Sequence, residues 1–82
     1  MVRILFFAHL REMLGSGESL PYSQDIATVA ALRGQLAKRG GDWETLDTTR
    51  NLRAAVNQTM AGFDAPVKDG DEVAFFPPVT GG

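Results

Sequence analysis

The sequence predicts an α+β domain of two layers, in which a mixed sheet packs on one main helix and a flexible tail leaves the C-terminal end. The chain has 82 residues, 44% of them hydrophobic, which suits one domain with a modest core. Runs of β-branched and aromatic residues lie near both ends, at 2–7 and 72–76, and each predicts a strand. Between them, apolar residues at helical spacing follow Thr28 and predict the main helix.

The first strand has a core face and an outward face. Side chains of a strand alternate between its two faces. Because Arg3 is charged, its face is expected to point outward, and Phe7 shares that face. Val2, Ile4 and Phe6 are then expected to point into the core.

A second, shorter strand is expected at 18–22, paired with the first as a hairpin. The turn between them is predicted at Gly15-Ser16-Gly17. Since Pro21 cannot donate a hydrogen bond to a neighbouring strand, this strand is expected at an edge of the sheet.

The main helix is predicted to begin after Thr28, a residue type that caps helix N-termini. It is expected to end at Gly40-Gly41. Gly34 lies inside it, which indicates either close packing on the sheet or simple tolerance of a glycine. The residues that form its apolar face are Val29, Leu32 and Leu36.

The second half is expected to contain a short helical turn at 43–47, a strand at 52–57, a turn at 69–71 and the last strand at 72–76. On that last strand Phe76 shares a face with Glu72 and Ala74, so it is expected to point outward. With the first and last strands side by side in the middle, this order is that of the β-grasp fold. A ferredoxin-like split βαβ fold is the alternative, but it requires a second clear helix.

Composition excludes several classes of function. The net charge of −2 and pI of about 5.1 disfavour nucleic-acid binding. No apolar run is long enough to cross a membrane, and we expect a cytoplasmic protein. The chain has no cysteine and one histidine, His9, so neither a metal site nor a nucleophilic side chain is expected.

The C-terminal segment is the strongest candidate for chemistry. Pro77 and Pro78 should end the last strand and hold the chain extended, which divides it into a domain (1–76) and a tail (77–82). Gly81 and Gly82 have no side chains, so this end could enter a narrow channel and present an unhindered carboxyl group. A frayed end without function is the alternative. Without a cysteine, any sulfur carried would be held as a thiocarboxylate on Gly82.

The chain resembles the small subunit of molybdopterin synthase (MoaD type), a ubiquitin-like family. The resemblance covers essentially the whole chain and is weakest at 15–22 and 40–49. The motifs that carry it are Val2 to Ala8, Arg11-Glu12, Thr28-Val29 with Leu32-Arg33, Val56-Asn57-Gln58-Thr59, Phe63-Asp64, and Asp69 to Gly82.

This resemblance implies a sulfur carrier with a β-grasp fold. An E1-like enzyme would adenylate Gly82 with ATP, and a sulfur donor system would convert it to a thiocarboxylate. The tail would then enter the large subunit of molybdopterin synthase, which holds the catalytic side chains, and pass sulfur to cyclic pyranopterin monophosphate. The small subunit itself binds no cofactor, and two copies of each subunit would form a heterotetramer.

By position, the resemblance also assigns residues to the partner surface. Val79 and Thr80 would line the channel beside Gly81, and Arg11 would add a salt bridge at the rim. Its apolar part would comprise Phe7, Met60 and Phe76. Of these, Met60 or Phe76 could instead belong to the core.

Two other functions remain open from the sequence. One is a sulfur carrier for thiamine thiazole synthesis, or a ubiquitin-like modifier that joins Gly82 to lysines. The other is a non-catalytic β-grasp interaction domain with an inert tail, because a fold does not fix a function.

Overall fold

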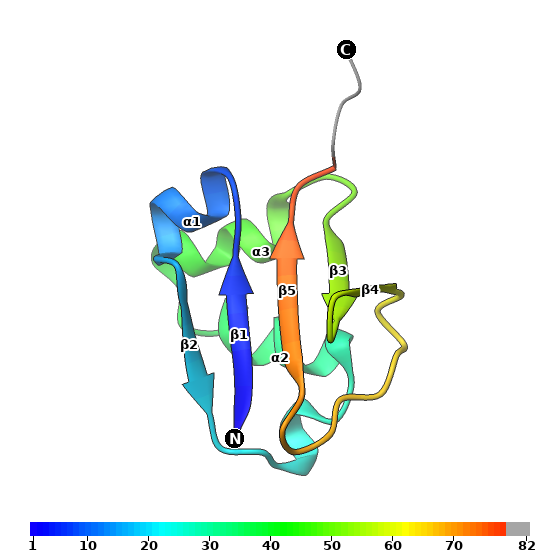
Figure 1. Cartoon of the computed structure of the whole chain (residues 1–82). Helices are drawn as coiled ribbons and strands as arrows, with labels where there is room; N and C mark the ends of the chain where they lie inside the picture. The colour runs from blue at the N-terminus through cyan, green and yellow to red at the C-terminus, as the bar shows by residue number, and fades with distance from the viewer. Residues whose placement is uncertain (79–82) are drawn as a thin grey trace.

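The computed structural model describes residues 1–78 of the chain and shows a five-stranded sheet with helices on one face (Figure 1). The strands are β1 (Val2–Phe6), β2 (Gly17–Leu20), β3 (Arg53–Val56), β4 (Thr59–Ala61) and β5 (Glu72–Phe76). The helices are α1 (His9–Leu14), α2 (Val29–Ala37) and α3 (Thr45–Thr48), with short 3₁₀ turns η1 (Gln24–Ile26) and η2 (Gly41–Glu44).

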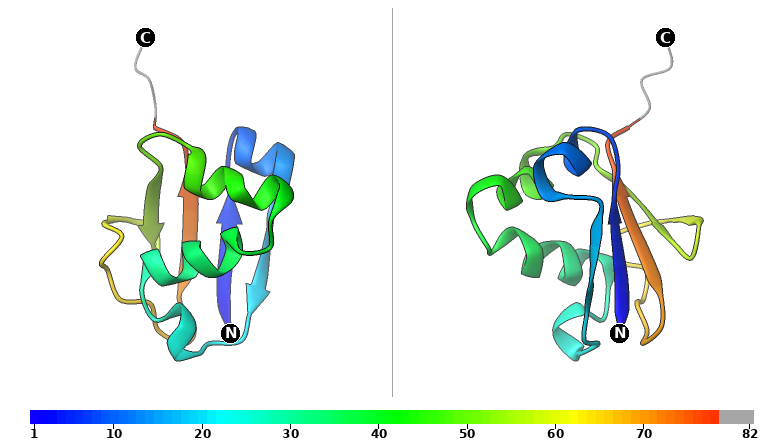
Figure 2. Two further views of the ribbon diagram at one scale, coloured as in Figure 1. Left: turned by 180° about the vertical axis from the view of Figure 1, so that it is seen from behind. Right: turned by 60° about the vertical axis from the view of Figure 1, so that its left-hand side comes forward.

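The strand order is β2-β1-β5-β3-β4, with the first and last strands together in the centre. β1 and β5 are parallel, whereas β2 pairs with β1, β3 with β5, and β4 with β3 in antiparallel fashion. The helix α2 crosses behind the sheet, and Figure 2 shows this second layer from behind. The predicted α+β class and β-grasp arrangement are confirmed.

The core lies between α2 and the inner face of the sheet, as the alternation on β1 predicts. Ile4 and Phe6 are at most 1% exposed. Phe6 stacks on Phe75 with ring centroids 6.3 Å apart, and Trp43 meets its edge at 5.7 Å. From α2, all three residues of the expected apolar face are buried: Val29, Leu32 and Leu36.

The start of α2 is set by Thr28, whose hydroxyl oxygen accepts a hydrogen bond from the backbone N–H of Ala31 at 3.1 Å. The predicted N-cap is therefore confirmed. A methyl group built on Gly34 would meet no atom within 4 Å, so the expectation of close packing there is wrong. The helix tolerates this glycine without needing it for contact.

The predicted antiparallel pairing of the first two strands is confirmed, but they are not joined by a tight turn alone, because α1 lies between them in the chain. The sequence analysis did not predict α1, which has only six residues and buries just one side chain, Leu10. Its sequence therefore lacks a periodic apolar face. β2 is an edge strand, as Pro21 indicated, but ends at Leu20.

Gly17 has a packing role that the sequence did not reveal. A Cβ atom on this residue would lie 2.3 Å from the carbonyl oxygen of Ile4. The close approach of β2 to β1 therefore requires glycine at this position.

β4 is the other element that the sequence analysis missed. It has three residues and pairs with β3 across a two-residue turn. Asn57 and Gln58 both have positive φ in this turn, 50° and 69°, which is the conformation of a tight type I′ hairpin. Asn at the first turn position is typical of a type I′ turn, but the second position holds Gln where Gly is usual, so the sequence does not predict the turn.

Candidate functional site

The strand directions bring three chain segments together at the end of the sheet where the tail begins. β1 and β5 are parallel, so both end at this edge, and β3 starts there because it runs in the opposite direction (Figure 1). The backbone N–H of Phe7 donates to the carbonyl oxygen of Phe75 at 3.2 Å, which ties the end of β1 to the end of β5. Pro77 and Pro78 follow, both partly exposed. The tail thus starts from the central strand of the sheet, which is paired on both sides.

Four of the predicted site residues lie outside the part of the chain that the structure describes. These are Val79, Thr80, Gly81 and Gly82. Their roles in entering a channel and carrying a group remain predictions from the sequence.

The outward face of the sheet, on the side away from α2, carries the three apolar residues assigned to the partner surface. Phe7 is 45% exposed and Met60 is 60% exposed, so the alternative that Met60 belongs to the core is wrong. Phe76 is partly exposed while its neighbour Phe75 is fully buried, which confirms the alternation predicted for β5.

An apolar row that the sequence analysis did not identify joins these residues across the sheet. Leu5 lies beside Ala74, Ala74 beside Ala55, and Ala55 beside Met60 in consecutive strand registers. Leu5 and Ala74 are partly exposed, Ala55 is buried at 8% exposure, and Met60 is exposed. Since strand register decides which residues meet, this row could not be predicted from a single strand. Together with the exposed Phe7, the exposed end of this row suits docking of another protein.

The acidic residues near the start of β5 serve the domain itself. They lie at the opposite end of β5 from the tail, where Asp69 forms an ion pair with the amino group of Met1. Asp71 accepts hydrogen bonds from the side chain of Asn57 (3.0 Å) and from the backbone N–H of Lys68 (2.9 Å). The first of these contributes most to holding the pKa of Asp71 below its ordinary value, because both stabilise the charged carboxylate.

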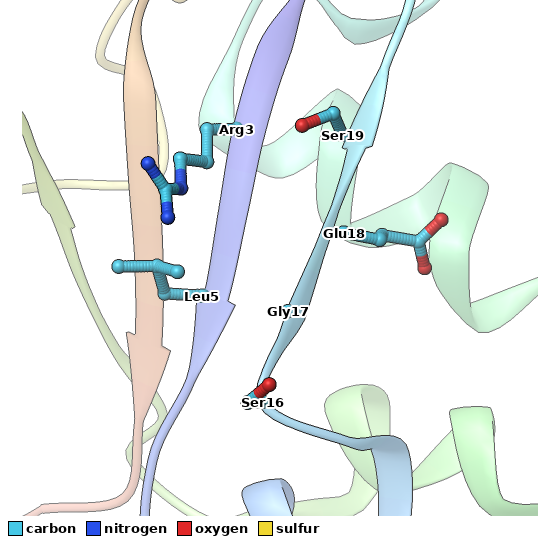
Figure 3. A pocket seen from close by; sticks show the side chains of 6 residues that line it. All are labelled: Arg3, Leu5, Ser16, Gly17, Glu18 and Ser19. Atoms are coloured by element: carbon cyan, nitrogen blue, oxygen red, sulfur yellow. The ribbon is translucent and has the colours of Figure 1, made fainter.

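No enclosed pocket with converging polar groups is found within residues 1–78. The hollow drawn in Figure 3 lies between β1 and β2 and is open to solvent. Arg3 and Leu5 reach over β5, while Glu18 points the other way, toward Arg39, with which it forms two hydrogen bonds of 2.6 and 3.0 Å. These side chains do not converge on a substrate.

The lone histidine and the acidic side chains make no metal site in the described part of the chain. His9 is exposed, and its Nε2 lies 3.4 Å from the hydroxyl oxygen of Thr49. No group of three potential ligands surrounds it or any other position there.

Over the same residues, no helix combines the length and apolar character that a membrane span requires.

Comparison with known families gives a match over residues 4–82, nearly the whole chain, to the ThiS family. The chain belongs to the ThiS family. Full-length relatives agree with the resemblance noted in the sequence. The molybdopterin synthase sulfur carrier subunit of Escherichia coli is 49% identical over 82 residues, covering 100% of both chains. The protein of the same name from Haemophilus influenzae is 44% identical over the same length.

The fold is also shared with a solved structure of SAMP1, small archaeal modifier protein 1, from Haloferax volcanii. It superimposes with a TM-score of 0.75 at 26% identity, covering 99% of this chain and 98% of that one. The proteins similar to this chain therefore include two named as sulfur carrier subunits and one named as a modifier.

Proposed function

We propose that this ThiS-family chain is the sulfur carrier subunit of molybdopterin synthase. The observation that carries the proposal is the 49% identity, over the full length of both chains, to the subunit of that name from Escherichia coli. The geometry agrees with it: a tail that ends in Gly81-Gly82 starts beside the exposed side chain of Phe7 and the partly exposed side chain of Phe76.

The proposed chemistry takes place on the carboxyl group of Gly82. At neutral pH this carboxylate is a poor electrophile, since its ordinary pKa is about 3.5. An E1-like enzyme would therefore join it to AMP, using ATP and releasing pyrophosphate. Sulfur from a donor system would then displace AMP to leave the thiocarboxylate. The sulfur finally passes to cyclic pyranopterin monophosphate.

The protein's own residues would position this group rather than react. The apolar row and the side chains of Phe7, Phe76 and Met60 would dock on the large subunit, which supplies the catalytic side chains. Pro77 and Pro78 would restrict the conformations of the tail base and so lower the entropy lost when the tail enters its channel. Gly81 would pass where a side chain could not.

The proposal is tested by intact-mass analysis after incubation with the activating enzyme, ATP and a sulfur source. The expected result is replacement of one oxygen by sulfur on a C-terminal fragment that contains Gly82. Fragment analysis is essential, because oxidation of any of the three methionines adds the same nominal mass. The matched control is a chain extended by one alanine after Gly82, which should remain unmodified. An unmodified wild-type chain, under conditions that charge the Escherichia coli relative, would refute the proposal.

A modifier that joins Gly82 to lysines is the second candidate, favoured by the structural similarity to SAMP1. It would use the same adenylate but would end with an amide bond to an acceptor protein. Supplying the charged chain with the large subunit and the pterin precursor separates the two. Formation of molybdopterin would identify the carrier, whereas attachment of the chain to lysines of other proteins, without molybdopterin, would identify the modifier.

A non-catalytic interaction domain is tested by removing the tail. Binding of the same partners by the shortened chain would indicate such a domain.

A further inference from the structure

Three arginines lie on segments that meet at the end of the sheet from which the tail leaves. Arg53 begins β3 and lies opposite Phe76 in the register of β3 and β5. Arg50 lies in the loop that leads from α3 into β3, and Arg11 lies on α1, which follows the end of β1. We call Arg11, Arg50 and Arg53 the arginine collar.

The collar carries unneutralised charge. All three side chains are exposed, and the ion pairs found among residues 1–78 use other cations: the amino group of Met1, Arg33 and Arg39. Carboxylates also lie on the neighbouring helices: Glu12 follows Arg11 on α1, Asp42 and Glu44 lie on η2, which contacts α1, and Asp47 on α3 pairs with Arg33. The three arginines are therefore available to a partner as individual cations, without a net positive charge on this end of the molecule.

Carboxylates lie at the other end of β5, but cations accompany them. Asp69 and Asp71 precede this strand and Glu72 begins it, while the amino group of Met1 pairs with Asp69 and Arg3 lies opposite Glu72 in the register of β1 and β5. Exposed arginines at the tail end can attract a partner that bears carboxylates as the two molecules approach.

The neighbours of the collar indicate a protein partner. Arg53 adjoins the partly exposed ring of Phe76, and Phe7 lies at the same edge. An apolar centre with charged side chains around it is the usual composition of a protein interface. Arginine also pairs with carboxylates through two parallel hydrogen bonds, which fixes orientation as well as attraction.

We propose that the collar, through Arg50 and Arg53 in particular, docks on carboxylates around the channel of the large subunit that receives the tail. This inference rests on the function proposed above. The collar would steer the tail end toward its channel and hold the tail base while the negatively charged terminus moves further in. The family resemblance assigns a rim contact to Arg11 alone, whereas the structure adds the two arginines beside β3.

The experiment measures association of the full chain with the large subunit by stopped-flow fluorescence at about 0.1 M and about 1 M NaCl. The variant is the double substitution Arg50→Glu/Arg53→Glu. The matched control, Lys38→Glu/Lys68→Glu, makes the same change in net charge away from the collar, at the end of α2 and before β5. Because Arg53 lies in a strand, Arg50→Glu alone serves as a second variant that leaves the sheet intact. Thermal unfolding verifies that each variant is folded.

The expected result is a loss of at least about 10-fold in association rate for the double variant at 0.1 M salt, with a smaller loss for Arg50→Glu. At 1 M salt the difference should nearly vanish, because charges are then screened within about 3 Å. The association rate of the lysine control should stay within about 2- to 3-fold of wild type at both salt concentrations, because its charges lie away from the proposed interface.

Four outcomes would overturn the inference. Equal losses in the collar and lysine variants would show that only net charge matters. No loss in the collar variants would show that the arginines face solvent in the complex. Binding of a single-stranded RNA oligonucleotide by wild type but not by the collar variant would assign the arginines to a nucleic acid instead. If wild type does not associate with the large subunit at all, the proposed function fails, and the collar inference fails with it.

Discussion

Phe75 and Phe76 are adjacent in sequence, yet the structure assigns them opposite roles, so the same substitution at each should have different effects. Phe75 is 0% exposed and stacks on Phe6, whereas Phe76 is partly exposed on the outward face. Truncating a fully buried Phe to Ala costs about 3–5 kcal/mol of unfolding free energy, because the cavity does not fill. For a side chain that is only partly buried, the loss is about 1 kcal/mol.

These free energies convert to melting temperatures through the entropy of unfolding. For 82 residues this entropy is about 170 cal/mol/K, so each 1 kcal/mol lowers Tm by about 6 °C. Phe75→Ala should therefore lower Tm by about 18–30 °C, and Phe76→Ala by about 6 °C. Circular dichroism melts of both variants at neutral pH measure this difference.

Binding should rank the two substitutions in the reverse order. In titration calorimetry at 15 °C, where both variants are expected to be folded, Phe76→Ala should weaken binding to the large subunit by about 10-fold or more. Phe75→Ala should affect it less, since its ring does not reach the surface. Similar drops in Tm for the two variants would refute the assignment of inward and outward faces on β5. A wild-type affinity for Phe76→Ala would remove Phe76 from the partner surface.

Three further predictions concern the fold and its dependence on pH. Thr28→Ala removes the cap of α2 and should lower the unfolding free energy by about 1 kcal/mol in urea titrations; no change would mean that the cap contributes nothing. Gly17→Ala brings Cβ against the carbonyl oxygen of Ile4, so it should release the edge strand, and hydrogen exchange of β2 amides should accelerate while β5 stays protected. Asp71 has a pKa below its ordinary 3.8, so its stabilising effect is full above that pH and is lost as pH falls through the lowered value. Asp71→Asn should therefore flatten the decline of Tm below pH 4, and an unchanged slope would contradict the assigned hydrogen bonds.

Much of the fold follows from local patterns. The alternation of Val2, Ile4 and Phe6, the cap at Thr28 and the outward position of Phe76 are each set by neighbours within a few residues, and the structure confirms them. Central pairing of the first and last strands was predicted from the order of the elements, which is that of the β-grasp fold, and the structure confirms it.

The elements that were missed are short and depend on distant contacts. α1 buries one side chain and β4 has three residues, so neither carries a period long enough to recognise. The same limit applied to the site: the outward direction of single residues was predictable, but the row formed by Leu5, Ala74, Ala55 and Met60 depends on register across four strands. The arginine collar likewise results from strand directions, since its members are far apart in sequence.

The position of β5 has a consequence for how the protein is made. The pair β2-β1 and the pair β3-β4 contact each other in the sheet only through β5, which is the last strand to be translated. Until β5 leaves the ribosome, β1 and β3 each expose an unpaired edge, and the nascent chain is prone to aggregation and proteolysis. Folding can then be completed only when the segment directly before the tail has been synthesised. Prematurely terminated chains that lack β5 would be removed by quality control, so the folded population that meets the partner enzymes would be enriched in chains translated as far as the tail.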